Sequence, residues 1–207
     1  MDTNQKTPLY FYHLVNKDVN LSKGLNSLQY MYDHKMFKEF DKNVLKYKQR
    51  IINEWGLKEY HGKENLTRED YIEALKKFRG QNGAYYIYFF RYPPFINLGD
   101  KIKELSKVKD IYRINIHDEK LATQIEEIFY GYDLSYSDNQ KLDENYYEQI
   151  KIEDYFKNYD DQREMNFSTL NHIGIAFKNG NCPKIYLEKI NWPETLEDIK
   201  QIEGEEK

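Results

Sequence analysis

Four residues whose types can bind nucleotides or carry protons stand in two aromatic segments. His13 lies in LYFYHLV, and Tyr86, Tyr88 and Arg91 lie in YYIYFFR. A histidine can hydrogen-bond a hydroxyl group, an aromatic ring can stack on a planar ring, and an arginine pairs with phosphate or carboxylate. Each residue also has a structural interpretation, because aromatic strands pack cores, a histidine there can bond to backbone, and an arginine can join an internal salt bridge.

The spacing of apolar residues predicts the elements that would position these side chains. Thr67, with Glu69 and Asp70 in the first turn and Gly80 at the end, marks the boundaries of one helix especially clearly. We expect strands over 9–15, 85–91, 111–116 and 171–177, and helices over 24–55 (with a break at 33–35), 67–80, 100–107 and 118–130.

These elements predict an α+β fold with a small mixed or split β-sheet and several flanking helices. No repeat, linker or change in composition marks a boundary, so we expect a single domain over residues 1–207. Residues 1–7 and 203–207 are expected to be frayed tails.

Composition limits the classes of function. The mean hydropathy of −0.92 reflects 20 tyrosines, whose rings bury well, so we expect a folded, tyrosine-rich core. With 31 basic and 35 acidic residues, strong nonspecific nucleic-acid binding is not expected, although a local basic patch stays open. The sequence has no signal-peptide pattern and no apolar run of about 18 residues, which predicts a cytoplasmic protein without a membrane partner. Its bias toward Lys, Asn, Ile and Tyr is typical of a low-GC bacterium or its phage.

Several chemistries lack their motifs. The sequence contains no P-loop, Rossmann fingerprint, zinc-protease helix or nucleophile elbow. Cys182 and His172 could form a thiol–base pair across a hairpin, but nothing in the sequence activates the thiol. The acidic residues between 133 and 144 match no metal loop, so we interpret them as a solvated face and predict no metal.

The opening of the chain is similar to that of a known superfamily. His13, Asn20, Leu21, Gly24 and Leu25 match, in order, the His, Asn-Leu and Gly-Leu positions of the ADP-ribosyltransferase superfamily. The closest likeness is to its branch of DNA-targeting toxins and RNA 2'-phosphotransferases. Segment 85–91 resembles the family's aromatic second block, and segment 171–190 resembles its closing strand pair.

The resemblance implies NAD as cofactor and a split sheet with a cleft between two groups of strands. Breaking the bond between nicotinamide and ribose builds positive charge on the sugar, so the site must hold the ribose and place a carboxylate near it. In this interpretation His13 is catalytic and hydrogen-bonds a ribose hydroxyl, Tyr86 or Tyr88 stacks on the nicotinamide, and Arg91 pairs with the pyrophosphate.

Several carboxylates compete for the place of the family's glutamate. The resemblance calls for a glutamate leading into the closing strand, and Glu164, seven residues before Asn171, is the best placed. Asp160, Asp161 and Glu188 are alternatives.

Three functions from different classes remain open. The first is an ADP-ribosyltransferase-like enzyme that modifies a protein or nucleic-acid target, for which 131–159 would be a recognition segment. The second is a non-enzymatic module that binds a nucleotide or a host protein in an aromatic cleft. The third is an interaction protein that acts through an acidic, tyrosine-rich surface.

Overall fold

The computed structural model describes residues 9–90, 102–131, 147–150, 172–193 and 198 of the chain. Arg91, Glu164, Asp160 and Asp161, which the sequence nominated for the site, lie outside these residues, as do 132–146 and both tails. The strands are β1 (Tyr10–Asn16), β2 (Leu25–Asn26), β3 (Tyr86–Phe90), β4 (Lys109–Asn115), β5 (Ile125–Gly131), β6 (Tyr147–Ile150), β7 (His172–Phe177), β8 (Asn181–Cys182) and β9 (Glu188–Ile190). The α-helices are α1 (Leu28–Asp33), α2 (Phe37–Gln49), α3 (Arg68–Arg79), α4 (Ile102–Val108) and α5 (Glu119–Ala122).

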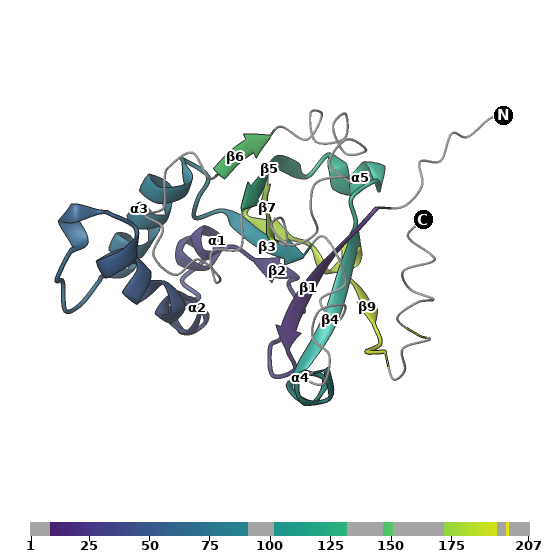
Figure 1. Ribbon diagram of the computed structural model, residues 1–207. Helices are drawn as coiled ribbons and strands as arrows, with labels where there is room; N and C mark the ends of the chain where they lie inside the picture. Colours follow the sequence, from purple (N-terminus) through teal and green to yellow (C-terminus); the bar gives the residue numbers. More distant parts are fainter. Residues whose placement is uncertain (1–8, 91–101, 132–146, 151–171, 194–197, 199–207) are drawn as a thin grey trace.

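Seven strands form one sheet in the order β6-β5-β7-β3-β1-β4-β9, and every described pair in it is antiparallel. Helices α1, α2 and α3 lie together to one side of the sheet, whereas α4 lies at the end of β4 (Figure 1). The α+β prediction is therefore confirmed.

Within the described residues, backbone pairing is sparse at one place, the junction between β1 and β3. These two strands pair there at Tyr12↔Phe90, where Phe90 is the last described residue of β3, whereas β1 pairs with β4 along all seven of its residues. Strands β3, β7 and β5 also pair over most of their length. The sheet thus consists of two well-paired groups of strands that meet at this junction.

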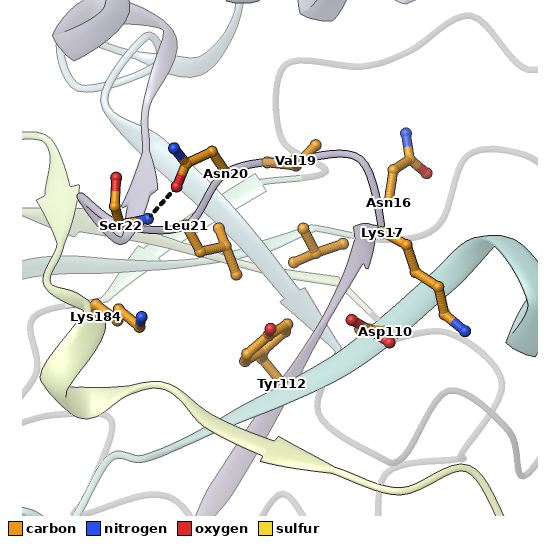
Figure 2. A pocket seen from close by; sticks show the side chains of 10 residues that line it. Asn16, Lys17, Val19, Asn20, Leu21, Ser22, Asp110, Tyr112 and Lys184 are labelled. Carbon is orange, nitrogen blue, oxygen red and sulfur yellow. Dashed lines mark hydrogen bonds between the residues drawn. The ribbon is translucent and has the colours of Figure 1, made fainter.

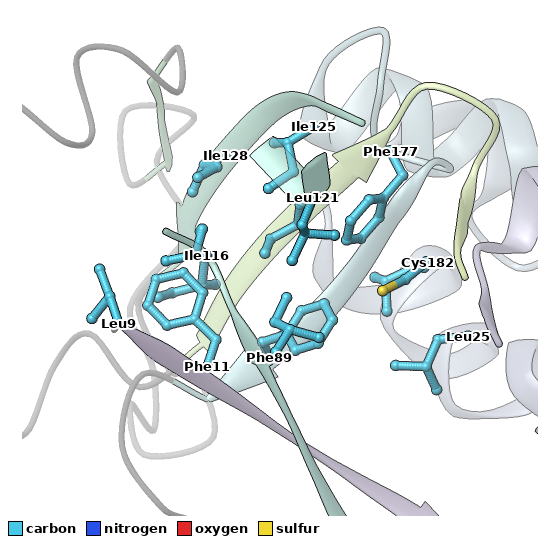
Figure 3. Packing of buried hydrophobic residues seen from close by; sticks show 14 of the residues in the cluster. Leu9, Phe11, Leu25, Phe89, Ile116, Leu121, Ile125, Ile128, Phe177 and Cys182 are labelled. Carbon is cyan, nitrogen blue, oxygen red and sulfur yellow. The ribbon is translucent and has the colours of Figure 1, made fainter. Parts of the chain in front are cut away.

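The main core covers one face of the sheet, which we call the His13 face. Alternation along β1 and β3 places Phe11, His13 and Val15 on this face together with Ile87 and Phe89. Figure 3 shows how side chains from β1, β3, β5, β7 and α5 converge there. Full burial of a side chain such as Phe11 contributes about 1.5–3 kcal/mol.

The opposite face, which we call the Tyr86 face, carries Tyr12, Tyr86 and Tyr88. Helices α1–α3 form a second core of their own. Arg79 at the end of α3 connects that core to the sheet, because its guanidinium lies 4.8 Å from the centre of the Tyr88 ring.

Helix α3 follows the sequence prediction closely. The Thr67 side chain accepts from the Asp70 backbone, the Asp70 carboxylate accepts from the Thr67 backbone, and Gly80 is the C-cap. The predicted break at 33–35 is also present between α1 and α2, where Lys35 has a φ of 55°.

The predicted helix over 118–130 is wrong. Asp118 does cap a helix, but α5 ends at Ala122 and β5 follows. The apolar residues Ile125 and Ile128 are three apart, as on a helix, yet both are buried in the core because a bulge between Ile125 and Glu127 shifts the strand register. The bulge therefore lets two residues three apart face the same side of a strand, and this spacing was interpreted as helical.

The predicted helix over 24–55 begins too early. Leu25 and Asn26 form β2 and pair with Cys182 and Asn181 of β8, and α1 starts only after the N-cap Ser27. Leu25 is buried in the core on the His13 face, which explains its apolar character.

Candidate functional site

His13 lies at the junction of the two groups of strands. It comes from β1, and its Nδ1 atom lies 2.6 Å from the backbone carbonyl oxygen of Tyr88 in β3. Because a carbonyl oxygen only accepts, Nδ1 is the donor, and a neutral ring then has its acceptor nitrogen at Nε2. The side chain contact therefore links β1 to β3 where their backbone pairing is sparse, and it orients the imidazole.

Aromatic side chains border His13 on the same face. The Phe89 ring lies 5.5 Å from the imidazole, centre to centre, at an angle of 57°. Tyr112 of β4 is the direct cross-strand partner of His13, so their side chains project to the same side. His13 itself is half-buried, so it is neither a fully enclosed core residue nor a surface one.

A cavity of about 250 Å³, which we call the cavity beside His13, opens on this face. His13 is not itself a lining residue, but its cross-strand partner Tyr112 and Val15, two residues further along β1, both line the cavity. Its floor comes from β1 and β4, including Val15 and Tyr112. Its roof comes from the loop after β1, which we call the roof loop, and Lys184 of the segment after β8 lies at one side (Figure 2). The polar groups in the lining include Lys17, Asn20 and Lys184. Asn20 and Leu21, two residues of the sequence resemblance, thus line this cavity from the loop after β1.

Two sets of hydrogen bonds hold the roof loop, one within the loop and one to β8. Asn20 Oδ1 accepts a hydrogen bond of 2.8 Å from the backbone N–H of Ser22, which closes a turn. At its far end, Asn181 Nδ2 lies 2.7 Å from the Lys23 carbonyl oxygen and 2.7 Å from Asn26 Oδ1. The loop is therefore fixed by its own turn between Asn20 and Ser22 and by hydrogen bonds from Asn181 of β8.

Gly24 has a structural reason to be glycine. Its φ is +85°, and a Cβ there would lie 2.0 Å from the carbonyl oxygen of Cys182. Only a residue without a side chain fits this approach of the roof loop to β8. Gly24 of the resemblance therefore lets the loop after β1 approach the backbone of Cys182 and of Lys184, which lines the cavity.

Asp110 is a carboxylate that the sequence did not nominate. It lies in the cavity lining, on β4 opposite Val15, and therefore diagonal to His13 across the two strands. Its Oδ2 accepts from Lys189 Nζ at 2.8 Å, and the side chain is 19% exposed. The available signal was its place in the alternation, because Asp110 lies on the same face of the strand as Tyr112 and Ile114.

The structure places Tyr86 and Tyr88 on the opposite face from the His13 side chain. Tyr86 is buried, and its hydroxyl donates to Glu127 Oε2 at 2.8 Å, where Asn82 also donates at 2.6 Å. Of the nominated aromatic residues, Tyr88 approaches His13 through its backbone carbonyl. Glu127 was missed because it fell in the segment predicted to be helical.

Glu188, an alternative carboxylate, is also away from His13. It lies on β9 and makes a forked ion pair with Arg113, with distances of 2.8 and 3.1 Å. Arg113 pairs across from Tyr12 and so points to the Tyr86 face. Arg91 and Glu164, together with Asp160 and Asp161, lie outside the described residues, so their proposed roles stay predictions.

Cys182 does not form the thiol–base pair considered from the sequence. It is buried in the core and pairs with Leu25, while His172 lies at the opposite end of β7. Burial raises the pKa of the Cys182 thiol to about 12. A thiol that keeps its proton at neutral pH is a poor nucleophile.

A second cavity, of about 370 Å³, lies among α1, α2 and α3. Its charged groups bind one another: Arg68 forms two hydrogen bonds of 2.7 Å to Asp41, and the Tyr32 hydroxyl donates to Glu69. The hydrogen bond from Arg68 keeps the pKa of Asp41 below its ordinary value. These mutual pairings make it a weaker candidate for a ligand site than the cavity beside His13.

Among the described residues, no group of three or more His, Cys, Asp or Glu side chains is placed to hold a metal ion. Every helix within the described ranges is too short or too polar to cross a lipid bilayer. Comparison of the chain with protein-family models, curated proteins and solved structures finds no match.

Proposed function

We propose that this protein is cytoplasmic, that it is ADP-ribosyltransferase-like and that it uses NAD to modify a macromolecular target. The observation that carries the proposal is the position of His13 at the junction of two groups of strands, oriented by the Tyr88 carbonyl and beside a polar cavity. The sequence resemblance implies a split sheet with its ligand cleft between the strand groups. The sparse backbone pairing of β1 with β3 within the described residues, and the presence of His13 at that junction, support this interpretation.

The lining suits part of a dinucleotide. Lysine ammonium groups from Lys17 and Lys184 suit phosphate, and Asn20 suits sugar hydroxyls. The cavity volume is slightly below the range of about 300–1,000 Å³ that is usual for ligand pockets. It would therefore enclose one half of NAD and leave the other half outside the cavity.

When bound, NAD supplies a ribose on which positive charge develops as nicotinamide leaves. The acceptor nitrogen of His13 would take a hydrogen bond from a ribose hydroxyl. A carboxylate near the ribose would stabilise the developing charge. Asp110 is the carboxylate in the cavity lining, while Glu164 remains the proposal from the sequence.

The test is thermal unfolding with and without millimolar NAD for the wild type, His13→Ala and His61→Ala. His61 is an exposed histidine outside the site, so its variant is the matched control. A ligand at a hundredfold excess over its Kd stabilises the folded state by about 2.7 kcal/mol, which is a rise in Tm of roughly 5–10 °C for a chain of this size. We expect this rise in the wild type and in His61→Ala but not in His13→Ala. If NAD shifts no variant, or shifts His13→Ala as much as the wild type, the proposed site is wrong.

A second candidate function is non-enzymatic nucleotide binding. It is favoured by the placement of Tyr86 and Tyr88, whose rings lie away from the His13 face and so do not form the expected nicotinamide sandwich there. Measuring nicotinamide released from NAD by wild type and Asp110→Asn separates the two functions. An enzyme should release nicotinamide and the variant should release much less, whereas a binding protein should show the NAD-induced rise in Tm without release.

A further inference from the structure

Exposed apolar residues lie in or next to the segments that form the mouth of the cavity beside His13. In the described part of the chain, four large apolar residues are exposed; one of them lines the cavity, and two others are joined to lining residues through the backbone. Val19, 44% exposed, is part of the lining, and Ile185, 85% exposed, follows the lining residue Lys184. Val108 is joined to the mouth through its carbonyl oxygen, which accepts from the Lys17 N–H at 3.0 Å. Such a concentration of exposed aliphatic side chains is typical of an interaction surface.

The same mouth is locally basic, although the whole chain has a net charge of −4. Lys17 and Lys184 line the cavity, and Lys23 precedes Gly24, which closes against the backbone of Lys184. Within the described residues, none of these three lysines makes an ion pair.

The nearby carboxylates do not cancel this charge. Asp18 pairs with Lys42 at 3.1 Å, and Asp110 in the lining pairs with Lys189 at 2.8 Å. Each pair joins one ammonium group to one carboxylate, so each pair is neutral overall. The positive charge of the three unpaired lysines therefore remains.

We propose that this surface, which we call the basic rim (Lys17, Val19, Lys23, Lys184 and Ile185), docks an acidic segment of a partner protein that also carries aliphatic side chains. Charge complementarity selects the acidic partner, because carboxylates would meet the lysines. The aliphatic residues select protein over nucleic acid, because single-stranded bases bind by stacking on aromatic rings, which valine and isoleucine do not offer. The basic rim surrounds the cavity next to His13, so a docked segment would lie at the proposed NAD site, and this last step rests on the proposed function.

The test uses a fluorescein-labelled peptide of alternating glutamate and leucine, with a glutamate–serine peptide as the probe without aliphatic side chains. Binding is measured by fluorescence anisotropy with the full chain at low salt. We expect the glutamate–leucine peptide to bind, the glutamate–serine peptide to bind more weakly, and affinity to fall as salt rises.

Two variants probe the two kinds of contact. Reversing the charges in Lys17→Glu/Lys23→Glu/Lys184→Glu should weaken binding of the glutamate–leucine peptide by about tenfold or more. Replacing the apolar residues in Val19→Ser/Ile185→Ser should weaken it by about threefold or more while leaving the salt dependence in place.

The matched controls change residues of the same types elsewhere. Lys58, Lys120 and Lys178 are exposed and lie outside the basic rim, and Leu45 is the fourth exposed apolar residue. Lys58→Glu/Lys120→Glu/Lys178→Glu and Leu45→Ser should keep wild-type affinity. Thermal unfolding of each variant confirms that it is folded.

Several results would overturn the basic rim as a protein-docking surface. They are absence of peptide binding, equal loss in the control variants, or binding of duplex DNA or phosphatidylserine vesicles that displaces the peptide. The peptide test is separate from the NAD test, because peptide binding needs no cofactor. Peptide binding without an NAD-induced rise in Tm would support the docking surface and reject the proposed function. A rise in Tm with NAD but no peptide binding would support the proposed function and reject the docking surface.

Discussion

Replacing Gly24 by alanine should destabilise the protein far more than replacing a glycine with a similar backbone angle in open space. Gly24 has a φ of +85°, and Gly56 has a φ of +68°. A side chain in the left-handed region costs about 1–2 kcal/mol at either position. At Gly56 nothing lies within 4 Å of the added Cβ, so we expect no further cost.

At Gly24 the added Cβ would lie 2.0 Å from the Cys182 carbonyl oxygen, where ordinary contacts are 3.4 Å or longer. The obstacle is backbone, so a side-chain rotation cannot relieve it, and β8 must move away from β2. Loss of the two paired residues in that ladder would remove hydrogen bonds worth about 0.5–1.5 kcal/mol each. The expected total for Gly24→Ala is about 2–5 kcal/mol, against about 1–2 kcal/mol for Gly56→Ala.

The assay is urea unfolding of both variants and the wild type, followed by circular dichroism. The m-values should stay equal, and the midpoint of Gly24→Ala should fall by two or more times the shift of Gly56→Ala. If the two variants lose the same stability, the close approach of the roof loop to β8 is wrong, and with it our account of how the cavity beside His13 is shaped.

Two further outcomes follow from the buried polar groups. The Cys182 thiol, whose pKa burial raises to about 12, should resist thiol reagents at about pH 8 in the folded state and react after unfolding in urea. Because the unfolded thiol ionises at about pH 8.5, the free energy of unfolding should fall as pH rises from there toward 12. Cys182→Ala should lack this part of the pH dependence. Rapid labelling of the native protein by the thiol reagent would contradict burial of Cys182. Tyr86→Phe should lower the free energy of unfolding by about 1–2 kcal/mol, because Glu127 loses one of its two donors and keeps Asn82. The control variant Tyr85→Phe should change the free energy of unfolding little. Equal effects of the two variants in urea unfolding would show that the Tyr86 hydroxyl is not needed.

Local signals in the sequence predicted several elements correctly. The capping residues at Thr67 and Asp70 and the stop at Gly80 act within one turn of helix α3, so their effect does not depend on the rest of the fold. The alternating and aromatic segments became β1, β3, β4 and β7 for a similar reason, since side chains on neighbouring positions face opposite sides of any strand. Where a bulge changed this alternation, between Ile125 and Glu127, the prediction failed.

The candidate site could be predicted in part. The sequence indicated His13, because a histidine inside an apolar aromatic strand is an unusual residue whatever its partners. It could not indicate which aromatic neighbours His13 would have, because that depends on strand pairing. The pairing places Phe89 and Tyr112 beside it and sends the side chains of Tyr86 and Tyr88 to the opposite face.

The sequence by itself determined that the chain forms an α+β protein with aromatic strands and a well-capped helix, because composition and short-range spacing carry that information. The tertiary structure decided that β1 and β3 pair sparsely within the described residues, that Asp110 shares a cavity with residues of the loop after β1, and that Lys17 and Lys184 line that cavity. These residues lie up to about 170 positions apart in the chain. Strand order and register bring them together, and both result from packing the whole core rather than from any short segment.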